Sequence, residues 1–214
     1  MVLGLATLVS PARAQRAAAR CAPLDTNAEW YRRQREWLSE TRTTTWTNDS
    51  LRTLLLSAAA IDASRPLPVQ LGGAASADDA GAAVTDAAST AIAQLKQLAR
   101  ERQSPWPTRS VVGPAGVRAT WLLVQRDTAL QRTALHRMME AGPEESLAAD
   151  VAVLEDRVRL QSGRKQLYST QLRHAGTSLV PGLTEDSAHV DMRRDAAGLP
   201  PLRVALCASS TGPR

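Results

Sequence analysis

The chain has 214 residues, a hydrophobic fraction of 43% and a net charge of +5, which fit one domain with an ordinary core and argue against a disordered chain. Its apolar residues are mostly Ala and Leu, with no Phe, which favours helix over strand. The basic residues alternate with acidic ones instead of clustering, so the positive charge does not indicate a nucleic-acid-binding protein.

The N-terminus is typical of an exported protein. Residues 2–9 form a short apolar run, and Ala12-Arg13-Ala14 fits a cleavage site, so we expect residues 1–14 to be a signal peptide and the protein to be periplasmic or secreted. The run is too short to span a bilayer, and no other stretch is apolar enough to be a transmembrane segment.

The two cysteines lie close to the two ends of the chain. In an oxidising compartment, Cys21 and Cys207 are expected to form a disulfide, and the alternative is two free thiols. Neither cysteine lies in a C-x-x-C pattern, and His136, His174 and His189 are not at metal-ligand spacing. We therefore expect no metal and no cofactor.

Residues 15–47 are predicted to form an N-terminal extension. Thr26 and Glu29 have the spacing of a capping box, which predicts a helix that carries Trp30 and Trp37. The two tryptophans are two helical turns apart, so this helix is expected to dock on the domain or on a partner.

Residues 48–206 are predicted to be one mainly α domain, a helical bundle with a small β-hairpin near its C-terminal third, followed by a tail at 207–214. The hairpin is expected from residues 166–172 and 177–180, because the first of these segments alternates. The first helix of the domain is expected to begin at Asn48 or Asp49, and a surface loop is expected at 69–83. The later helices are expected to run up to about 102, from 113 to 142, from 143 to 163 and from 184 to 197.

Several short motifs follow one another in a fixed order through this domain. They are Leu51-Arg52 with Asp62-x-x-Arg65, Leu95-x-x-Leu98, Trp106-Pro107-Thr108-Arg109-Ser110, Trp121-Leu-Leu-Val-Gln125, Leu154-x-Asp156-Arg157, Gly163-x-x-Gln166-x-Tyr168-x-Thr170-Gln171, and Arg193-Arg194 with Gly198-Leu199-Pro200-Pro201. Together they resemble a bacterial family of unknown activity, the domain of unknown function 6624 family. The N-terminal tryptophan helix resembles an addition to it.

The chain departs from this family pattern at two positions. The family usually has His where this chain has Arg126, and Gly where this chain has Ser169. Arginine does not accept a proton near neutral pH, so a general base at that position is lost. The glycine implies a backbone conformation or a close approach that a serine side chain resists.

The polar motif residues are the candidate ligand-binding residues. They are Arg126, Asp156, Arg157, Gln166, Tyr168, Gln171, Arg194, Asp62 and Arg65. Guanidinium, amide and phenol groups bind carboxylates, phosphates or sugars. The structural alternative is that Asp62 and Arg65 form an ion pair within one helix, and that Asp156 pairs with an arginine to lock two helices.

The sequence supports three functional hypotheses. The first is a non-enzymatic exported module that binds a small polar or anionic ligand, or a protein partner, in a cleft lined by Arg126, Asp156, Gln166, Tyr168 and Arg194. The second is a hydrolase-type enzyme with a degenerate site that uses Asp156 and Tyr168 or a histidine. The third is a structural interaction protein that uses the tryptophan helix.

Overall fold

The structure is a computed structural model that describes residues 21, 23–39, 45–61, 63–64, 67, 69–72, 86–101, 104–176 and 178–211. Its helices and strands, in chain order, are α2 (Glu29–Trp37), α3 (Asp49–Ala59), α4 (Asp86–Arg100), α5 (Arg109–Val124), α6 (Thr128–Ala141), α7 (Ala148–Gln161), β1 (Leu172–Ala175), β2 (Ser178–Pro181), the 3-10 helix η3 (Ser187–His189), α8 (Val190–Ala196) and α9 (Leu202–Thr211). The mainly α class and the small hairpin are confirmed. The predicted signal peptide lies outside the described residues, as does most of the predicted loop at 69–83.

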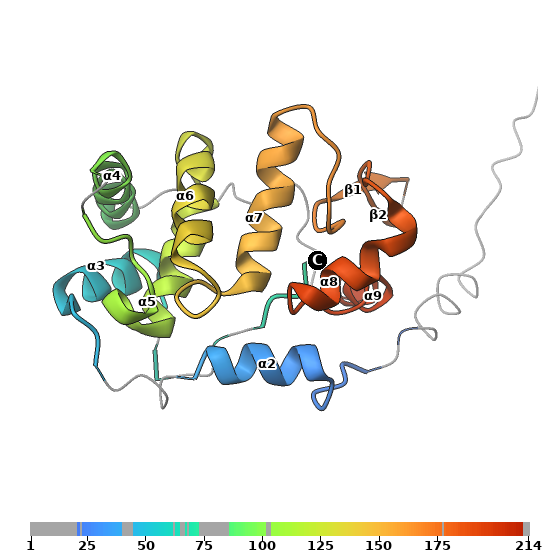
Figure 1. Ribbon diagram of the computed structural model, residues 1–214, viewed down its shortest axis with the longest axis horizontal. Coiled ribbons are helices and arrows are strands. Elements are labelled where there is room, and N and C mark those ends of the chain that lie inside the picture. Colours follow the sequence, from blue (N-terminus) through green and yellow to red (C-terminus); the bar gives the residue numbers. More distant parts are fainter. Residues whose placement is uncertain are drawn as a thin grey trace, which may run out of the picture.

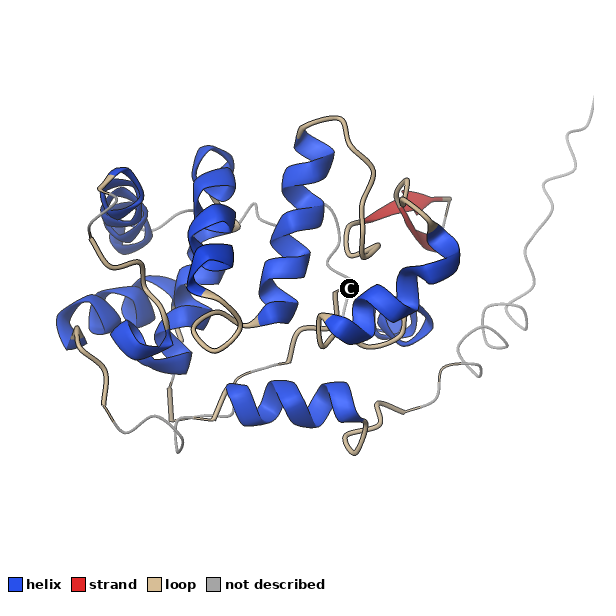
Figure 2. Ribbon diagram, viewed as in Figure 1, coloured by secondary structure: helices blue, strands red, loops and turns tan. Residues whose placement is uncertain are grey.

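The helices form a row that ends in the hairpin. In Figure 1, α4, α6 and α7 stand side by side, and α3 and α5 lie across their lower ends. The antiparallel pair β1–β2 lies at the other end of the row, next to α8 and α9 (Figure 2). No described helix is long and apolar enough to cross a membrane.

One hydrophobic core joins α3 to α7. Leu55, Leu95, Leu123 and Leu154 come from four of these helices, and each is fully buried. Each such side chain contributes about 2 kcal/mol through its burial alone. Apolar side chains from successive helices therefore face a common core.

The helix expected from 113 to 142 is two helices. The carboxylate of Asp127 accepts a hydrogen bond from the backbone N–H of Leu130 at 2.9 Å and begins α6, three residues after α5 ends. In the sequence, the helical spacing of Val117, Trp121, Val124 and Leu135 had concealed this N-cap. Within α5, Gly113 has φ +68°, and the main helical segment begins at Pro114, as expected.

Two other helix starts also differ from the prediction. Thr26 and Glu29 do not form a capping box, since Ala28 is the N-cap of α2 and makes no side-chain cap bond. The helix after Pro143 begins only at Ala148. Glu145, which lies in the segment expected to be helical from 143 onward, accepts hydrogen bonds from the N–H and O–H of Ser110, both at 2.9 Å, at the start of α5. The expected cap by Asn48 is confirmed.

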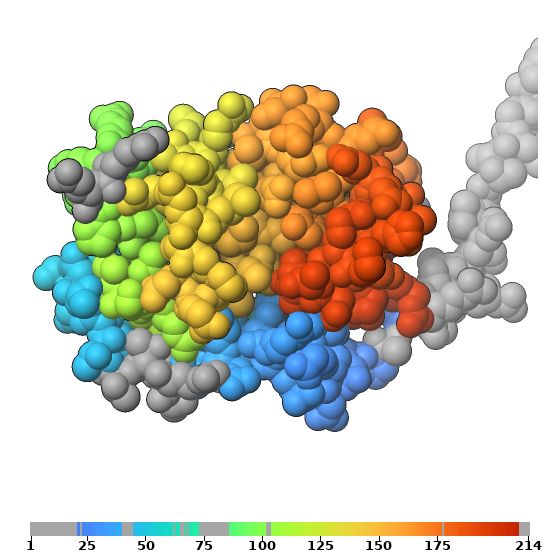
Figure 3. Space-filling view, viewed as in Figure 1, coloured from blue at the N-terminus to red at the C-terminus, as the bar shows by residue number. Residues whose placement is uncertain are grey.

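Helix α2 lies along one side of the domain, as Figure 3 shows in blue. Its Gln34 side chain is 1% exposed, donates to the carbonyls of Gln70 and Gly198 at 2.8 Å each, and accepts from the N–H of Gln70. Arg35 also donates to the carbonyl of Leu67 at 2.9 Å. The expected docking of this helix on the domain is thus observed.

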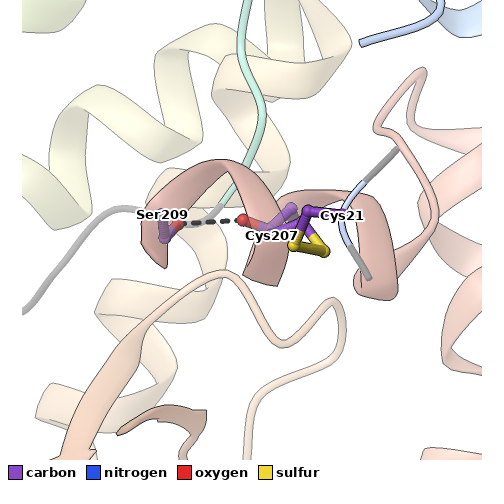
Figure 4. The surroundings of a disulfide bond; sticks show 4 residues. Cys21, Cys207 and Ser209 are labelled. Carbon is purple, nitrogen blue, oxygen red and sulfur yellow. Dashed lines mark hydrogen bonds between the residues drawn. A yellow bond between two sulfur atoms is a disulfide. The ribbon is translucent and has the colours of Figure 1, made fainter. Parts of the chain in front are cut away.

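A disulfide joins the segment before α2 to the last helix. Cys21 and Cys207 are bonded, with their Cα atoms 5.4 Å apart, and Cys207 lies within α9 (Figure 4). Helix α9 continues to Thr211, so the residues expected to form a tail from 207 onward are helical as far as 211. The helix begins directly after Pro200 and Pro201, whereas the last helix expected from the sequence ended at residue 197.

Candidate functional site

The candidate residues converge where a loop, residues 166–171, wraps around the side chain of Asp156 on α7. The Oδ1 atom of Asp156 accepts from the N–H of Leu167 at 2.6 Å and of Tyr168 at 3.1 Å. Its Oδ2 atom accepts from the N–H of Tyr168 at 3.2 Å and from the N–H and O–H of Thr170 at 2.9 and 2.8 Å. The carboxylate is fully buried, and its hydrogen-bonding capacity is used by the loop backbone.

Two glutamines close this loop. The Oε1 atom of Gln166 accepts from the N–H of Gln171 at 2.7 Å, and its Nε2 donates to the carbonyl of Gln171 at 3.0 Å. The Nε2 of Gln171 donates to the carbonyl of Val153 and to the hydroxyl of Thr170, at 3.3 and 3.1 Å. These bonds make 166–171 an ordered loop, whereas the sequence predicted a strand there, and β1 begins at Leu172.

Ser169 occupies a left-handed backbone conformation, with φ +54°. A residue with a Cβ adopts this region at a cost of about 1 kcal/mol relative to glycine, so the glycine in the family pattern has a physical reason. Serine is held here because its hydroxyl forms a hydrogen bond of 2.6 Å with the hydroxyl of Thr184, and the side chain is 1% exposed. Serine at this position therefore has a backbone strain that glycine would not have, and the hydrogen bond to Thr184 helps to hold it in this conformation.

Arg194 on α8 also stabilises the loop, because its guanidinium donates hydrogen bonds to backbone carbonyls. It is fully buried and donates to the carbonyls of Tyr168 at 2.7 Å, Pro200 at 2.7 Å and Leu71 at 3.0 Å. Burial lowers its pKa to about 10, which nearby Asp191 and Asp156 oppose. The guanidinium joins three separate segments of backbone.

Tyr168 and Glu155 form a half-buried pair at the edge of this region. The Tyr168 hydroxyl donates to Oε2 of Glu155 at 3.5 Å. Burial, with Glu155 and Asp156 nearby, raises the pKa of Tyr168 to about 12, and burial also raises the pKa of Glu155. Sequence reasoning did not select Glu155, although it lies next to Asp156 in the motif.

Arg157 differs from the other buried arginine of this region. Its Nε donates to Oε1 of Gln171 at 3.2 Å, and its Nη1 donates to the carbonyl of Gln125 at 3.4 Å, so both partners are neutral. The residue is 9% exposed, and burial lowers its pKa. Among the described residues, no carboxylate forms a salt bridge with it.

The next residue after Gln125 is Arg126, which is exposed at the end of α5 and has no side-chain partner among the described residues. Both amide atoms of Gln125 are buried and lack a hydrogen-bond partner in the described part of the chain. Gln125 was quoted in the motif but was not selected as a site residue. A buried amide without a hydrogen-bond partner can be recognised only from the tertiary structure.

The candidate residues thus divide into two groups. Asp156, Gln166 and Arg194, three of the five expected to line a cleft, use their polar groups inside the fold. Arg126 and Arg157 form no salt bridge with any acid among the residues that the structure describes. Asp62 and Arg65 lie outside the described residues. In the described ranges, no three His, Cys, Asp or Glu side chains are grouped so as to hold a metal ion.

The chain was compared with protein families, curated proteins and solved structures. No curated protein and no solved structure matches it. A family model described as a family of unknown function, DUF6624, matches residues 52–208, a range that contains the buried loop, Asp156, Arg126 and Arg157. The chain therefore belongs to the DUF6624 family, as its motifs had indicated, and α2 lies before the matched range.

Proposed function

We propose that this protein is an exported, non-enzymatic module that binds a small anion, a carboxylate or a phosphate group, through Arg157 and Arg126. The observation that carries the proposal is Arg157, a buried guanidinium with only neutral partners. A buried charge costs several kcal/mol unless an opposite charge compensates it, so a bound anion would be strongly favoured here.

The comparison with Arg194 sharpens this argument. Arg194 is even more deeply buried, but Asp191 and Asp156 lie near enough to support its charge. For Arg157, burial is the only influence on the pKa, and no acid offsets it. Of Arg157 and Arg194, only Arg157 therefore has a charge left for a ligand to compensate.

The donor geometry around Arg157 suits an oxyanion. Its Nε and Nη1 are held by Gln171 and Gln125, which leaves Nη2 without a protein partner among the described residues. The carbonyl that Arg157 contacts belongs to Gln125, the residue directly before Arg126. Two guanidinium groups, one fixed and one exposed, supply the charge-assisted hydrogen bonds that carboxylates and phosphates take.

The same contacts favour binding over hydrolysis. Asp156 was the candidate acid or base of a hydrolase, but both of its oxygens accept backbone N–H groups. A general base must reach the proton that it removes, and this carboxylate is fully buried beneath the loop. Asp156 is better understood as the residue that orders the loop from which Gln171 contacts Arg157.

Titration calorimetry with inorganic phosphate and with acetate tests the site. We expect Arg157→Gln to weaken binding of the preferred anion about tenfold or more, because a charge-assisted hydrogen bond is lost, and Arg126→Gln to weaken it less. Arg157→Lys, which keeps the charge but not the fork, should retain part of the affinity. Arg173→Gln, an exposed arginine on β1, is the matched control.

The proposal fails if neither anion binds to the wild-type protein, or if Arg157→Gln and Arg173→Gln bind with the same affinity. Circular dichroism of each variant establishes that the fold is kept. A preference for phosphate or for acetate identifies which of the two chemistries the site selects.

Export is the second part of the proposal. It is supported by the Cys21–Cys207 disulfide, since such bonds persist in oxidising compartments, and by the apolar run and cleavage pattern of residues 1–14. Mass spectrometry of the protein from an expressing bacterium is expected to show a chain that begins at Gln15. An intact N-terminus on protein recovered from the cell would contradict export.

A further inference from the structure

The segment that carries α2 is fastened to the domain at both of its ends. At one end, the disulfide bonds Cys21 to Cys207 on α9 (Figure 4). At the other end, the backbone N–H of Thr47 donates to the carbonyl of Ser110 on α5 at 3.1 Å. Helix α2 lies between these two anchors, so the disulfide is one of the bonds that keep this helix near the domain.

Between the two anchors, Gln34 on α2 holds two separate segments of the domain. Its side-chain amide donates to the carbonyls of Gln70 and Gly198, at 2.8 Å each, and accepts from the N–H of Gln70. The side chain is almost fully buried. If α2 moved away, buried backbone groups of both segments would lose their partner, so the docking of α2 helps to fix the two segments in place.

The same two segments position Arg194. The carbonyls of Leu71 and Pro200, each within two residues of a partner of Gln34, accept from the guanidinium at 3.0 and 2.7 Å. The guanidinium also donates to the carbonyl of Tyr168, in the buried loop, at 2.7 Å. Because Arg194 is fully buried, it cannot exchange a lost carbonyl for water without moving. Hydrogen bonds therefore connect α2 to the buried loop through one side chain.

The disulfide is open to thiol–disulfide exchange. Cys21 and Cys207 are both partly exposed, so a dithiol reaches the bond. One thiolate of the dithiol attacks a sulfur atom and releases the other cysteine, which takes up a proton. The second thiolate then displaces the remaining cysteine from the mixed disulfide. The protein gains two electrons and two protons, and the dithiol is oxidised to its own disulfide.

We propose that the Cys21–Cys207 disulfide is a redox switch, whose reduction by a dithiol releases α2 and loosens the buried loop through Gln34 and Arg194. Reduction turns a segment closed at both ends into a free tail, which gains conformational entropy when α2 leaves the domain. In the chain-entropy model, closing a loop of this length changes the population of the released state on the order of a hundredfold.

The switch has a consequence that rests on the proposed anion site. The buried loop ends at Gln171, whose Oε1 accepts from Nε of Arg157 at 3.2 Å. A loosened loop no longer holds this guanidinium in one orientation, so reduction should weaken the binding of phosphate about threefold or more.

Hydrogen exchange compares the oxidised protein with the protein reduced by dithiothreitol. We expect reduction to speed exchange on the order of a hundredfold at the Trp37 amide of α2, and about tenfold at the Leu167 and Thr170 amides of the buried loop. The amide of Leu95 is the control for global unfolding, because its helix, α4, packs on α3, α5 and α6. Its exchange should change much less.

Two variants of α2 separate the switch from a general loss of stability. Gln34→Ala keeps the disulfide and removes the bonds to both segments, so the loop amides should exchange faster even without reductant. Arg33→Gln is the matched control, since it removes an exposed ion pair with Asp195, and it should leave the loop unchanged. A Cys21→Ser, Cys207→Ser protein should exchange like the reduced protein and should not respond to dithiothreitol.

Each outcome decides between the possibilities. Equal acceleration at Leu95 and Leu167 on reduction would indicate global destabilisation and overturn the switch. Faster exchange in α2 with an unchanged loop would overturn the connection through Arg194. Equal phosphate affinity in the two redox states would overturn the control of the anion site. If the oxidised protein does not bind phosphate at all, the proposed function fails, and the exchange rates still decide the switch.

Discussion

Replacing Asp156 by asparagine tests whether this carboxylate anchors the loop at 166–171. The substitution keeps the size of the side chain and removes its charge. In the native protein Oδ1 accepts from Leu167 and Tyr168, and Oδ2 accepts from Tyr168 and Thr170. Whichever way the asparagine amide is turned, its NH2 group faces at least one backbone N–H that then has no acceptor.

The cost follows from these contacts. A buried N–H without an acceptor costs about 1–3 kcal/mol, and the remaining bonds lose about 1 kcal/mol when the acceptor is no longer charged. We therefore expect Asp156→Asn to lower the free energy of unfolding by about 2–4 kcal/mol. This is a large part of the stability of a typical domain.

Urea unfolding followed by circular dichroism measures this change, and Glu155→Gln is the matched control. Glu155 is the neighbouring carboxylate on α7, but it accepts only one long hydrogen bond, from Tyr168 at 3.5 Å. Its loss should change the free energy of unfolding by at most about 0.5 kcal/mol. If the two variants were equally stable, the anchoring role of Asp156 would be refuted. Faster hydrogen exchange at the Leu167 and Thr170 amides should accompany the loss of stability.

Three further predictions concern other parts of the fold. Ser169→Gly should be about 1 kcal/mol more stable than Ser169→Ala in urea unfolding, because only glycine relieves the positive φ; the reverse order would contradict that conformation. In a Tyr31→Phe variant, the absorbance of Tyr168 should titrate at about pH 12. Because an unfolded tyrosine ionises near pH 10, the contribution of Tyr168 to stability should be lost as the pH rises between these two values. A titration midpoint near pH 10 would argue against the buried Tyr168–Glu155 pair. The Cys21–Cys207 bond spans a sequence separation of 186, so its reduction should lower the free energy of unfolding by about 5 kcal/mol in the chain-entropy model. The stability of a Cys21→Ser, Cys207→Ser protein should not respond to reductant. Equal melting temperatures of the native protein with and without reductant would contradict the prediction.

Local sequence signals determined much of the fold. The Ala- and Leu-rich composition and the periodic apolar residues predicted a mainly helical domain, and the cap at Asn48 was placed correctly. Gly163 was correctly expected to end α7, since its φ of +69° is open to glycine. Such signals succeed because helix periodicity and capping depend on residues within about one turn of each other.

The same local reasoning failed where two signals competed. Apolar residues on both sides of 125–127, such as Val124 and Leu135, keep a helical spacing, and this spacing outweighed the Asp127-Thr128 capping signal in the prediction. Alternation in residues 166–171 indicated a strand, but Asp156 draws the backbone N–H groups of this segment inward, so they are not available for a sheet. That side chain lies ten or more residues earlier in the chain, beyond the reach of any local pattern.

For the candidate site, the sequence by itself selected the polar segments and the two cysteines, because these residues stand out from an otherwise apolar and helical pattern. Only the tertiary structure decided which of the polar residues hold the fold together and which keep capacity for a ligand. Asp156 and Arg194 bond to backbone groups from other segments, and Gln166 closes its own loop, whereas Arg157 has no salt-bridge partner in the part of the chain that the structure describes. The physical reason is that the burial and the partners of a charged side chain depend on which segments pack together. The order of residues along one helix does not determine which segments these are.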